Sequence, residues 1–352
     1  MLQLGFCEKV VYSLRSLYNR WGYRQYKMSK FEEYDLYARN KDFLISDSVI
    51  TFMDPSGKLM ALKPDVTLSI VKNTKDGDSL QKLYYDENVY RADKNSHSFR
   101  EITQVGLECQ GTIDNYCIAE VLQLAAESLA LVSENSVLQV SHLGLVSKLI
   151  DDVGIRHKSR ALRLIGQKNV HELMALCAQE GVTEENAQVL KTLVQLWGSP
   201  EIVLPQAEQL LNGITDIAPL QQLADITAAC DMDLLRLDFS VVDDVHYYNG
   251  IVFKGFVQGL PSSVLSGGQY DKLMQKLGRT SGAIGFAVYM DALERLDTEK
   301  KEYDVDTVLL YTESTDLRAI AQKAKQLNGE GCSVSVQRNL PENLRYRQVV
   351  KL

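Results

Sequence analysis

The chain lacks several features that define common classes of protein. It has only 7 prolines in 352 residues, and its 22 glycines follow no period, which excludes collagenous and low-complexity chains. Its cysteines lie far apart and form no C-x-x-C pair, so neither a disulfide framework nor a cysteine metal site is indicated. With 45% hydrophobic and 24% charged residues the composition is that of a folded protein. We therefore expect reduced thiols in a cytoplasmic globular protein.

An excess of positive charge and a long hydrophobic run are also missing. Lys and Arg number 38 against 46 Asp and Glu, and the formal net charge of −8 argues against a general nucleic-acid surface. No window of 18 residues is uninterruptedly apolar, and Glu8 and Lys9 interrupt the N-terminal segment early. The sequence thus predicts no membrane span and no secretion signal.

The signatures of several enzyme classes are absent as well. The sequence contains no G-x-G-x-x-G, no G-x-x-x-x-G-K-[ST], no H-E-x-x-H and no G-x-S-x-G. Dinucleotide-binding, P-loop, zinc-protease and α/β-hydrolase functions therefore lack their sequence signal. We predict neither a cofactor nor a metal.

What is present indicates an α+β protein with two or three domains, since 352 residues are too many for one compact core. Apolar side chains recur at three- and four-residue steps near the N-terminus, and Asp54-Pro55-Ser56-Gly57 is turn chemistry between two strand-like runs. The elements expected in this part are a helix from Phe6 to Trp21, a hairpin at 49–62, strands at 81–91 and 100–111, and a helix at 119–132. This order favours an antiparallel sheet flanked by helices.

The second half changes character twice. From about 144 to 235 the sequence is rich in Leu and Ala with helical periodicity, and strand patterns resume at 235–242 and 247–257. Residues 303–352 have the pattern of a small β-α-β unit. We therefore expect four segments: the first part of a core at 1–143, a helical insertion at 144–235, the second part of the core at 236–300, and a C-terminal unit at 301–352.

Polar side chains are unusually numerous on the expected sheet. Gln104 and Glu108 are four apart on one strand, so they share a face. The whole set comprises Asp65, Thr67, Arg91, Gln104, Glu108, Tyr247, Tyr248 and Tyr270. A guanidinium, carboxylates, an amide and phenols can together hold a small zwitterion. The pattern also fits the polar face of a half-exposed sheet, and the sequence alone leaves both interpretations open.

Several segments, in this order, resemble the core of histidyl-tRNA synthetases, which are class II aminoacyl-tRNA synthetases. ALKPDVT (61–67) resembles their amino-acid-binding loop, and the segment 89–111 resembles motif 2. YYNGIVF (247–253), SGGQYDKL (266–273) and GAIGFAV (282–288) resemble the histidine-specific segment and the start of motif 3. The resemblance runs from about residue 5 to 296, and the tail resembles the opening β-α-β of the family's anticodon-binding domain. It implies a class II synthetase-like antiparallel sheet.

The sequence departs from the synthetases where catalysis is concerned. Asp243 stands where the synthetases have the arginine that stabilises the charge of adenylation, and Ala292 stands where motif 3 ends in an arginine over ATP. Loss of one such electrostatic stabiliser costs about 10²–10³ in rate. Ser29 replaces the motif 1 proline of the dimer interface, and the tail is about half an anticodon-binding domain. The amino-acid pocket is thus expected to persist without the ATP and tRNA equipment.

This pattern resembles the regulatory subunits of short-form ATP phosphoribosyltransferase, the first enzyme of histidine biosynthesis. The resemblance implies a chain without catalysis of its own, which dimerises within a hetero-octamer, activates a separate catalytic subunit and makes it sensitive to histidine. It also implies that the eight polar residues contact histidine as effector: Arg91 and Gln104 at the carboxylate, Asp65 and Thr67 at the ammonium, and Glu108 with Tyr248 at the imidazole. Two alternatives remain, a divergent histidyl-tRNA synthetase and a synthetase-like histidine-binding sensor with another partner.

Overall fold

The chain forms two compact units, Cys7–Arg295 and Leu296–Leu352, the latter together with the first six residues. The computed structural model describes residues 5–39, 49–93, 98–230, 233–242, 247–296 and 302–352. Each unit has its own sheet. The α+β class predicted from the sequence is confirmed, whereas the four predicted segment boundaries stay predictions.

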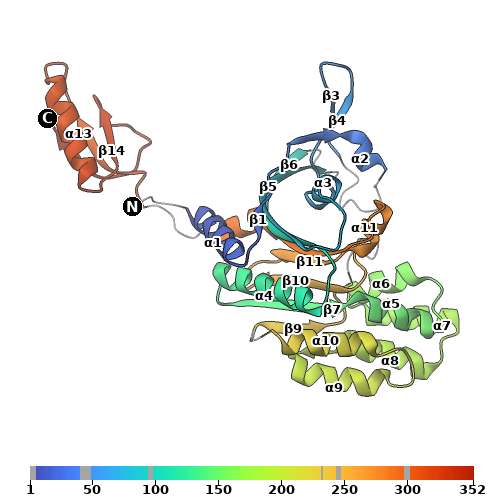
Figure 1. Cartoon of the computed structure of the whole chain (residues 1–352). Coiled ribbons are helices and arrows are strands. Elements are labelled where there is room, and N and C mark those ends of the chain that lie inside the picture. The colour runs from blue at the N-terminus through green and yellow to red at the C-terminus, as the bar shows by residue number, and fades with distance from the viewer. Residues whose placement is uncertain (1–4, 40–48, 94–97, 231–232, 243–246, 297–301) are drawn as a thin grey trace. The chain divides into compact units, whose positions relative to one another are not determined.

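A nine-stranded sheet within the described residues is the centre of the larger unit (Figure 1). Its middle strands, from β5 to β7, are antiparallel as expected, but β1 pairs with β5 and β9 pairs with β7 in parallel. In spatial order the strands are β1 (Arg24–Gln25), β5 (Gln81–Asp93), β6 (Ser98–Gly111), β12 (Gly282–Tyr289), β11 (Leu265–Gln269), β10 (Ile251–Val257), β7 (Ser136–His142), β9 (Leu235–Asp238) and β8 (Trp197–Gly198).

One face of this sheet is apolar and is covered by α1 (Phe6–Arg20) and α4 (Asn115–Val132). The Tyr18 ring of α1 meets the Phe286 ring of β12 edge-on with centroids 6.0 Å apart, and its hydroxyl lies 3.0 Å from Ser128 Oγ of α4. Asp114 begins α4 by accepting a hydrogen bond from the backbone N–H of Cys117. Helix α4 is long and apolar enough to cross a membrane, but 67% of it is buried in this core.

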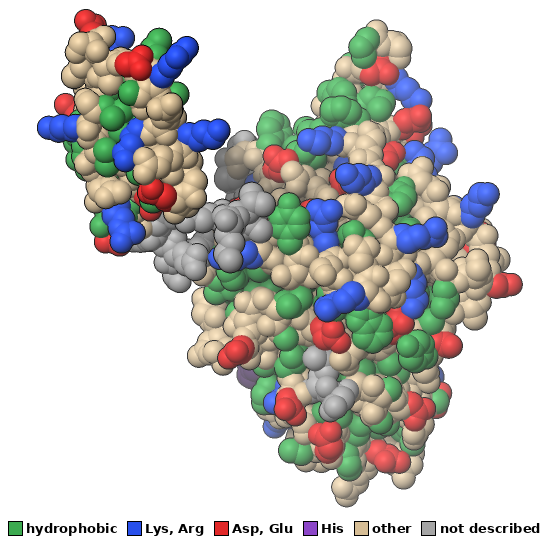
Figure 2. All heavy atoms as spheres, turned by 60° about the vertical axis from the view of Figure 1, so that its left-hand side comes forward, with side chains coloured by type: hydrophobic (Ala, Val, Ile, Leu, Met, Phe, Trp, Pro, Cys, Tyr) green, Lys and Arg blue, Asp and Glu red, His purple; other side chains and the backbone are tan. Residues whose placement is uncertain are grey.

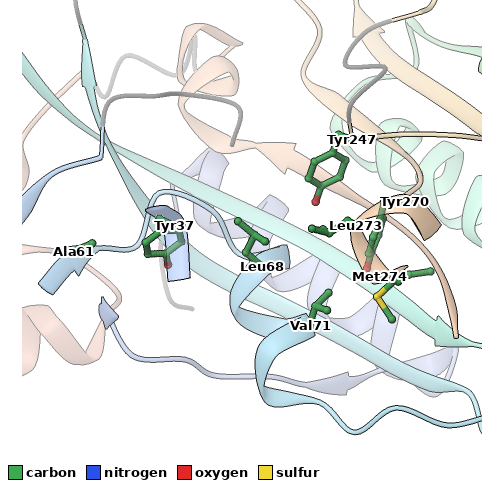
Figure 3. Packing of buried hydrophobic residues seen from close by; sticks show 9 residues of the cluster. Tyr37, Ala61, Leu68, Val71, Tyr247, Tyr270, Leu273 and Met274 are labelled. Carbon is green, nitrogen blue, oxygen red and sulfur yellow. The ribbon is translucent and has the colours of Figure 1, made fainter. Parts of the chain in front are cut away.

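The other face carries shorter elements, which bring together residues from distant parts of the sequence. They are α2 (Tyr34–Ala38), α3 (Thr67–Asn73), α11 (Asp271–Lys276), and a small sheet of β2 (Phe31–Glu33), β4 (Leu59–Leu62) and β3 (Thr51–Met53). Helix α12 (Met290–Leu293) and the 3₁₀ turn after it (Glu294–Leu296) lie instead beside α1, where Met290 and Glu294 line a cavity together with Tyr12. Figure 3 shows Tyr37, Leu68, Tyr247 and Tyr270 of these segments packed in one buried cluster. The candidate site is therefore set among α3, α11 and the polar face of the large sheet.

The stretch expected to be a helical insertion contains six helices within the described residues. They are α5 (Leu143–Asp152), α6 (Lys158–Gly166), α7 (Val170–Glu180), α8 (Glu184–Gln195), α9 (Pro200–Leu211) and α10 (Ala218–Ala228). The short strand β8 lies between α8 and α9 and extends the large sheet beyond β9. The expected strand at 235–242 ends early, at Asp238, because a turn follows in which Val241 N–H donates to the Asp238 carbonyl.

The C-terminal unit has one strand more than the sequence pattern predicted. Helix α13 (Leu317–Gly329) connects β13 (Val305–Leu310) to β14 (Val334–Gln337), as expected of a β-α-β unit. The expected tail contains β15 (Tyr346–Lys351), which pairs in parallel with the other side of β13. The result is a three-stranded parallel sheet with β13 at its centre.

His142 joins the large sheet to the helical stretch. It ends β7 and begins α5, where its Nδ1 accepts the backbone N–H of Leu145, and its Nε2 lies 3.1 Å from Gln222 Oε1 of α10. Burial lowers the pKa of His142. The ring is therefore neutral in the folded protein, with its proton on Nε2.

This arrangement predicts that the contribution of His142 to stability is lost in mild acid. Below an unfolded-state pKa of about 6.5, the unfolded chain binds a proton at residue 142 that the folded chain does not, so the free energy of unfolding falls as the pH falls. Replacing His142 with Asn keeps a helix-capping acceptor and removes the titration. We expect urea unfolding between about pH 7.5 and 5.5 to lose less stability in His142→Asn than in the wild type. Equal losses in the two proteins would contradict this role.

Candidate functional site

The site is built around the buried carboxyl group of Glu108 on β6. The side chain is 2% exposed, and two hydroxyls donate to it: Thr67 Oγ1 to Oε1 at 2.7 Å and Tyr270 Oη to Oε2 at 2.6 Å. Desolvation outweighs these donors and raises the pKa of Glu108 to about 8. The carboxyl group is therefore largely protonated near neutral pH, and it gains or loses a proton readily when a ligand binds.

The loop before α3 supplies a second buried carboxyl group. Asp65 Oδ1 accepts the backbone N–H of Leu68 at 2.9 Å in the first turn of α3. Burial raises the pKa of Asp65, although this N–H group and the nearby Arg91 oppose the shift. The loop is held in place by Lys63, whose fully buried ammonium lies 2.8 Å from Glu87 Oε2 of β5.

Arg91 lies behind this loop near the end of β5. Its Nε donates to the carbonyl oxygen of Pro64 at 3.2 Å. Its Nη2 is buried and has no hydrogen-bond partner among the described residues. A buried guanidinium nitrogen without an acceptor is costly, so this atom is suited to an acceptor supplied by a ligand.

The floor of the site is made of small side chains. Across neighbouring strands, Gly106, Ala287 and Ser266 follow one another on the face that carries Glu108. At Gly285, which pairs with Glu108, an added Cβ would lie 1.9 Å from Glu108 Oε2, so any larger residue would displace the carboxyl group. The polar face of the sheet is thus hollow here because its central positions carry almost no side-chain volume.

Tyrosines form the walls above this floor. The Tyr247 ring is 4.8 Å from the Tyr248 ring and 5.7 Å from the Tyr270 ring, between centroids. Tyr248 lies so close over Gly268 that an added Cβ would be 2.8 Å from its Cδ1. On another side, Tyr289 Oη lies 2.6 Å from Ser266 Oγ.

These groups enclose two adjoining cavities. The first is lined by Asp65, Thr67, Tyr85, Gln104, Glu108, Tyr247, Tyr248, Ser266, Tyr270, Gly285, Phe286, Ala287 and Tyr289, and it leaves about 30 Å³ for the centres of water molecules. The second shares four of these residues and leaves about 230 Å³; its further lining is Val241, Val252, Phe253, Lys254, Ser263 and Gly267. Since one water needs about 10–15 Å³ on this measure, the first cavity has room for roughly two waters.

The structure brings together seven of the eight residues that the sequence singled out, all of them in the lining of the first cavity. The eighth, Arg91, is not in that lining but lies behind it through its contact with Pro64. Ala292 lies half-buried in α12, and Asp243 falls outside the described residues. The role of each residue toward a ligand stays a prediction.

Sequence reasoning missed three polar residues of the lining, namely Tyr85, Ser266 and Tyr289. Tyr85 is six positions before Arg91 on one strand, so alternation alone would have placed it on the same face. Ser266 and Tyr289 pair with Ala287 and Gln104 respectively, and that register cannot be read from a single sequence.

The arrangement can bind a small ligand that carries both charges. Asp65 and Glu108 offer carboxyl oxygens, Arg91 offers an unused donor, and the other polar groups add hydrogen bonds. Within the part of the chain that is described, no group of three or more His, Cys, Asp or Glu side chains is placed to hold a metal ion.

Comparison with known proteins places the chain among homologues that share this fold. The sequence profile of the histidyl-tRNA synthetase family matches residues 3–293. An ATP phosphoribosyltransferase regulatory subunit of Thermoanaerobacter sp. is 30% identical, over 93% of this chain and 88% of that protein.

Solved structures agree with this assignment of the fold. The structure of an ATP phosphoribosyltransferase regulatory subunit/histidyl-tRNA synthetase from Bacillus halodurans superposes with a TM-score of 0.79 at 22% identity, covering 98% of this chain and 93% of that one. A chain of the ATP phosphoribosyl transferase (HisG:HisZ) complex from Thermotoga maritima gives 0.63 at 18% identity, covering 82% and 98%. The class II synthetase-like fold expected from the sequence is confirmed.

The packing of Gly285 against Glu108 generates a prediction about stability. We expect Gly285→Ala to lower the free energy of unfolding by about 1–3 kcal/mol, because the added methyl group overpacks a buried site. Denaturant unfolding measures the change. Gly329→Ala is the matched control: it lies in α13 with no atom within 4 Å of the added Cβ, and it should be neutral or slightly stabilising. If Gly285→Ala were as stable as the wild type, the described position of the carboxyl group would be wrong.

Proposed function

Because the chain belongs to the histidyl-tRNA synthetase family, and within it to the ATP phosphoribosyltransferase regulatory subunits, we propose that it is the non-catalytic regulatory subunit of such an enzyme in histidine biosynthesis. It activates a separate catalytic subunit and makes that subunit sensitive to histidine. The observation that carries the proposal is the pocket around Glu108, which offers carboxyl, amide and hydroxyl groups, together with the nearby Arg91, whose Nη2 has no hydrogen-bond partner among the described residues.

The absence of aminoacylation by this chain is part of the proposal. Ala292 occupies the place where the sequence resemblance puts the motif 3 arginine, and a methyl group offers ATP neither charge nor hydrogen bond. Without one such stabiliser an adenylation step slows by about 10²–10³. The acidic net charge of −8 is unfavourable for tRNA as a partner.

Histidine is the effector that fits the polar groups best. Its carboxylate would meet the unused Nη2 of Arg91 and the amide of Gln104. Its ammonium would meet Asp65 Oδ2, since Oδ1 already accepts the N–H of Leu68, and a lone pair of Thr67 Oγ1, whose proton goes to Glu108. The short Asp65 side chain therefore keeps one oxygen for the ligand.

The imidazole would lie between Glu108 and Tyr248. The first cavity has room for roughly two waters, so histidine needs more space than it offers as described. Tyr248 forms part of the boundary with the second cavity, where about 230 Å³ is open. Binding would therefore move the Tyr248 ring toward that space and join the two cavities.

The catalytic partner is a short-form ATP phosphoribosyltransferase subunit, a proposal supported by the likeness of this fold to a chain of the ATP phosphoribosyl transferase (HisG:HisZ) complex from Thermotoga maritima. We propose a homodimer of this chain within a hetero-octamer. The small sheet offers a surface for the dimer: its register places Phe31, Leu62, Met60 and Phe52 on one face, with the two phenylalanines 51% and 38% exposed and their ring centroids 5.4 Å apart. Figure 2 shows hydrophobic side chains on this projecting part of the molecule.

Feedback inhibition then follows from differential binding. Histidine must bind one arrangement of the complex better than another, and the difference is the coupling free energy, typically about 1–3 kcal/mol. Movement of Tyr248 is the local change that the pocket offers to such coupling.

The function is tested by reconstitution. We expect the purified chain to form a stable complex with a short-form catalytic subunit, to raise its phosphoribosyltransferase activity severalfold or more, and to make that activity sensitive to histidine. The chain alone should give no histidine-dependent ATP–pyrophosphate exchange, with a histidyl-tRNA synthetase as positive control. Robust exchange would establish a divergent synthetase instead. Histidine binding without any complex would favour the sensor.

The effector site is tested by the pH dependence of histidine binding. In the filled pocket the charges of Asp65 and Arg91 cancel, and so do those of the ligand's carboxylate and ammonium groups. One further proton is then shared between Glu108 and the imidazole. Since the pKa of Glu108 is about 8 in the empty pocket and that of imidazole is about 6.5, affinity should be greatest between these values. Above pH 8 a proton must be taken up, so the affinity should fall by up to tenfold per pH unit.

Calorimetry on Glu108→Gln separates this effect from titration of the ligand's ammonium group. The amide keeps the shape of the side chain but has no proton to lose, so the variant should lose the decline that begins near pH 8. Glu101→Gln is the control, because Glu101 is an exposed residue of the same strand and its replacement should leave the profile unchanged. Identical profiles in the wild type and Glu108→Gln would exclude Glu108 from the effector site.

A further inference from the structure

Lys168 has an unusual backbone conformation. Its φ angle is 51°, and it is the one non-glycine residue with positive φ among those described. It follows α6, where its N–H donates to the carbonyl of Ile165 and the next N–H, that of Asn169, donates to the carbonyl of Leu164. In this pattern of hydrogen bonds the residue with the left-handed conformation is usually glycine, as Gly181 is at the end of α7.

The contact made by the Lys168 side chain explains why a lysine occupies a position that usually carries glycine. Lys168 Nζ lies 2.8 Å from Asp238 Oδ2, although the two residues are 70 positions apart. The Asp238 side chain is 1% exposed, whereas that of Lys168 is 49% exposed. A buried carboxylate needs a charge partner, so the strained conformation of Lys168 brings a cation to a carboxylate that water does not reach.

Asp238 also stabilises the backbone turn at residues 238–241, which lies beside the candidate site. Its Oδ1 accepts both the N–H and the hydroxyl of Ser240, at 3.0 and 2.5 Å, and its carbonyl accepts the N–H of Val241. Val241 lines the second cavity together with Tyr247 and Tyr248. The ion pair therefore connects the α6–α7 turn to the residues that border the ligand pocket.

Other lysines of the helical stretch do not share these properties. Lys148 pairs with Asp152 one turn away on the same helix, and Lys158 pairs with Asp151, which is 53% exposed. Both pairs are local and reach water, and exposed pairs of this kind contribute little. Lys168 differs because its partner is buried and belongs to the central sheet.

We propose that Lys168 is a positioning residue for the effector pocket: its ion pair with Asp238 holds the turn from Asp238 to Val241, which lines the second cavity beside Tyr247 and Tyr248, and so couples the helical stretch to ligand binding. The inference deepens the proposed function, on which its ligand readout rests. Movement of the α6–α7 turn would change the affinity for histidine at a distance, without any contact between Lys168 and the ligand.

Two substitutions separate the effect of the Lys168 ammonium group on ligand affinity from the effect of its backbone conformation. Lys168→Gly removes the charge and relieves the left-handed conformation, whereas Lys168→Met removes the charge and keeps the conformation. Both should weaken histidine binding by a similar factor, about two- to thirtyfold, and Lys168→Arg should restore most of it. Lys158→Met, which breaks an exposed pair in the same stretch, should leave the affinity unchanged.

Hydrogen–deuterium exchange on the same proteins gives a readout that does not need the ligand. Backbone amides of β10 and of residues 239–242 should exchange faster in both charge-removing variants, while those of α1 and α4 should not change. If the variants only lose thermal stability, with unchanged affinity and unchanged local exchange, the ion pair is purely structural and the inference is overturned. If the wild type fails to bind histidine, the proposed effector is wrong, and the exchange data still decide whether Lys168 positions this segment.

Discussion

The burial of one acid, Glu108, is the constraint on which the rest of the site depends. An apolar side chain of similar size at this position would need no hydrogen bonds, whereas a carboxyl group removed from water needs donors. Thr67 and Tyr270 supply them from α3 and from the end of β11, so both segments must lie close to β6. Gly285 must also remain without a side chain. Such a costly arrangement is understandable if a ligand completes it.

The two faces of the large sheet have different roles: one packs against helices, and the other forms the pocket. Under α1 and α4 the face is apolar and rigid, with Tyr18 packed against Phe286 and bonded to Ser128. On the opposite face the small residues of the central strands leave a hollow. The stable layer holds the strands in register, and the register is what keeps Glu108 opposite Gly285.

The sequence predicted those features that depend on local patterns. The alternation of side chains along a strand placed Gln104 and Glu108 on one face, and the order of the family motifs placed Asp65 and Tyr270 in the same pocket. Both kinds of pattern can be recognised in short stretches of sequence. It did not predict Tyr289 in the lining or β15 beside β13, because each of these depends on a pairing between distant segments. Nor did it predict the conformation of Lys168, which local propensity disfavours and the distant Asp238 stabilises.

A pocket that binds an amino acid without activating it can use its binding energy differently from an enzyme. A synthetase must hold back part of that energy for the transition state, which its arginines stabilise. In the non-catalytic subunit that we propose, no transition state competes, and the whole difference in affinity between two conformations is available to shift their populations. The same polar face therefore suits regulation once catalysis is lost, provided that a movable group separates the empty from the filled pocket. Tyr248, one of the four residues that line both the small first cavity and the larger second one, is in a position to be that group.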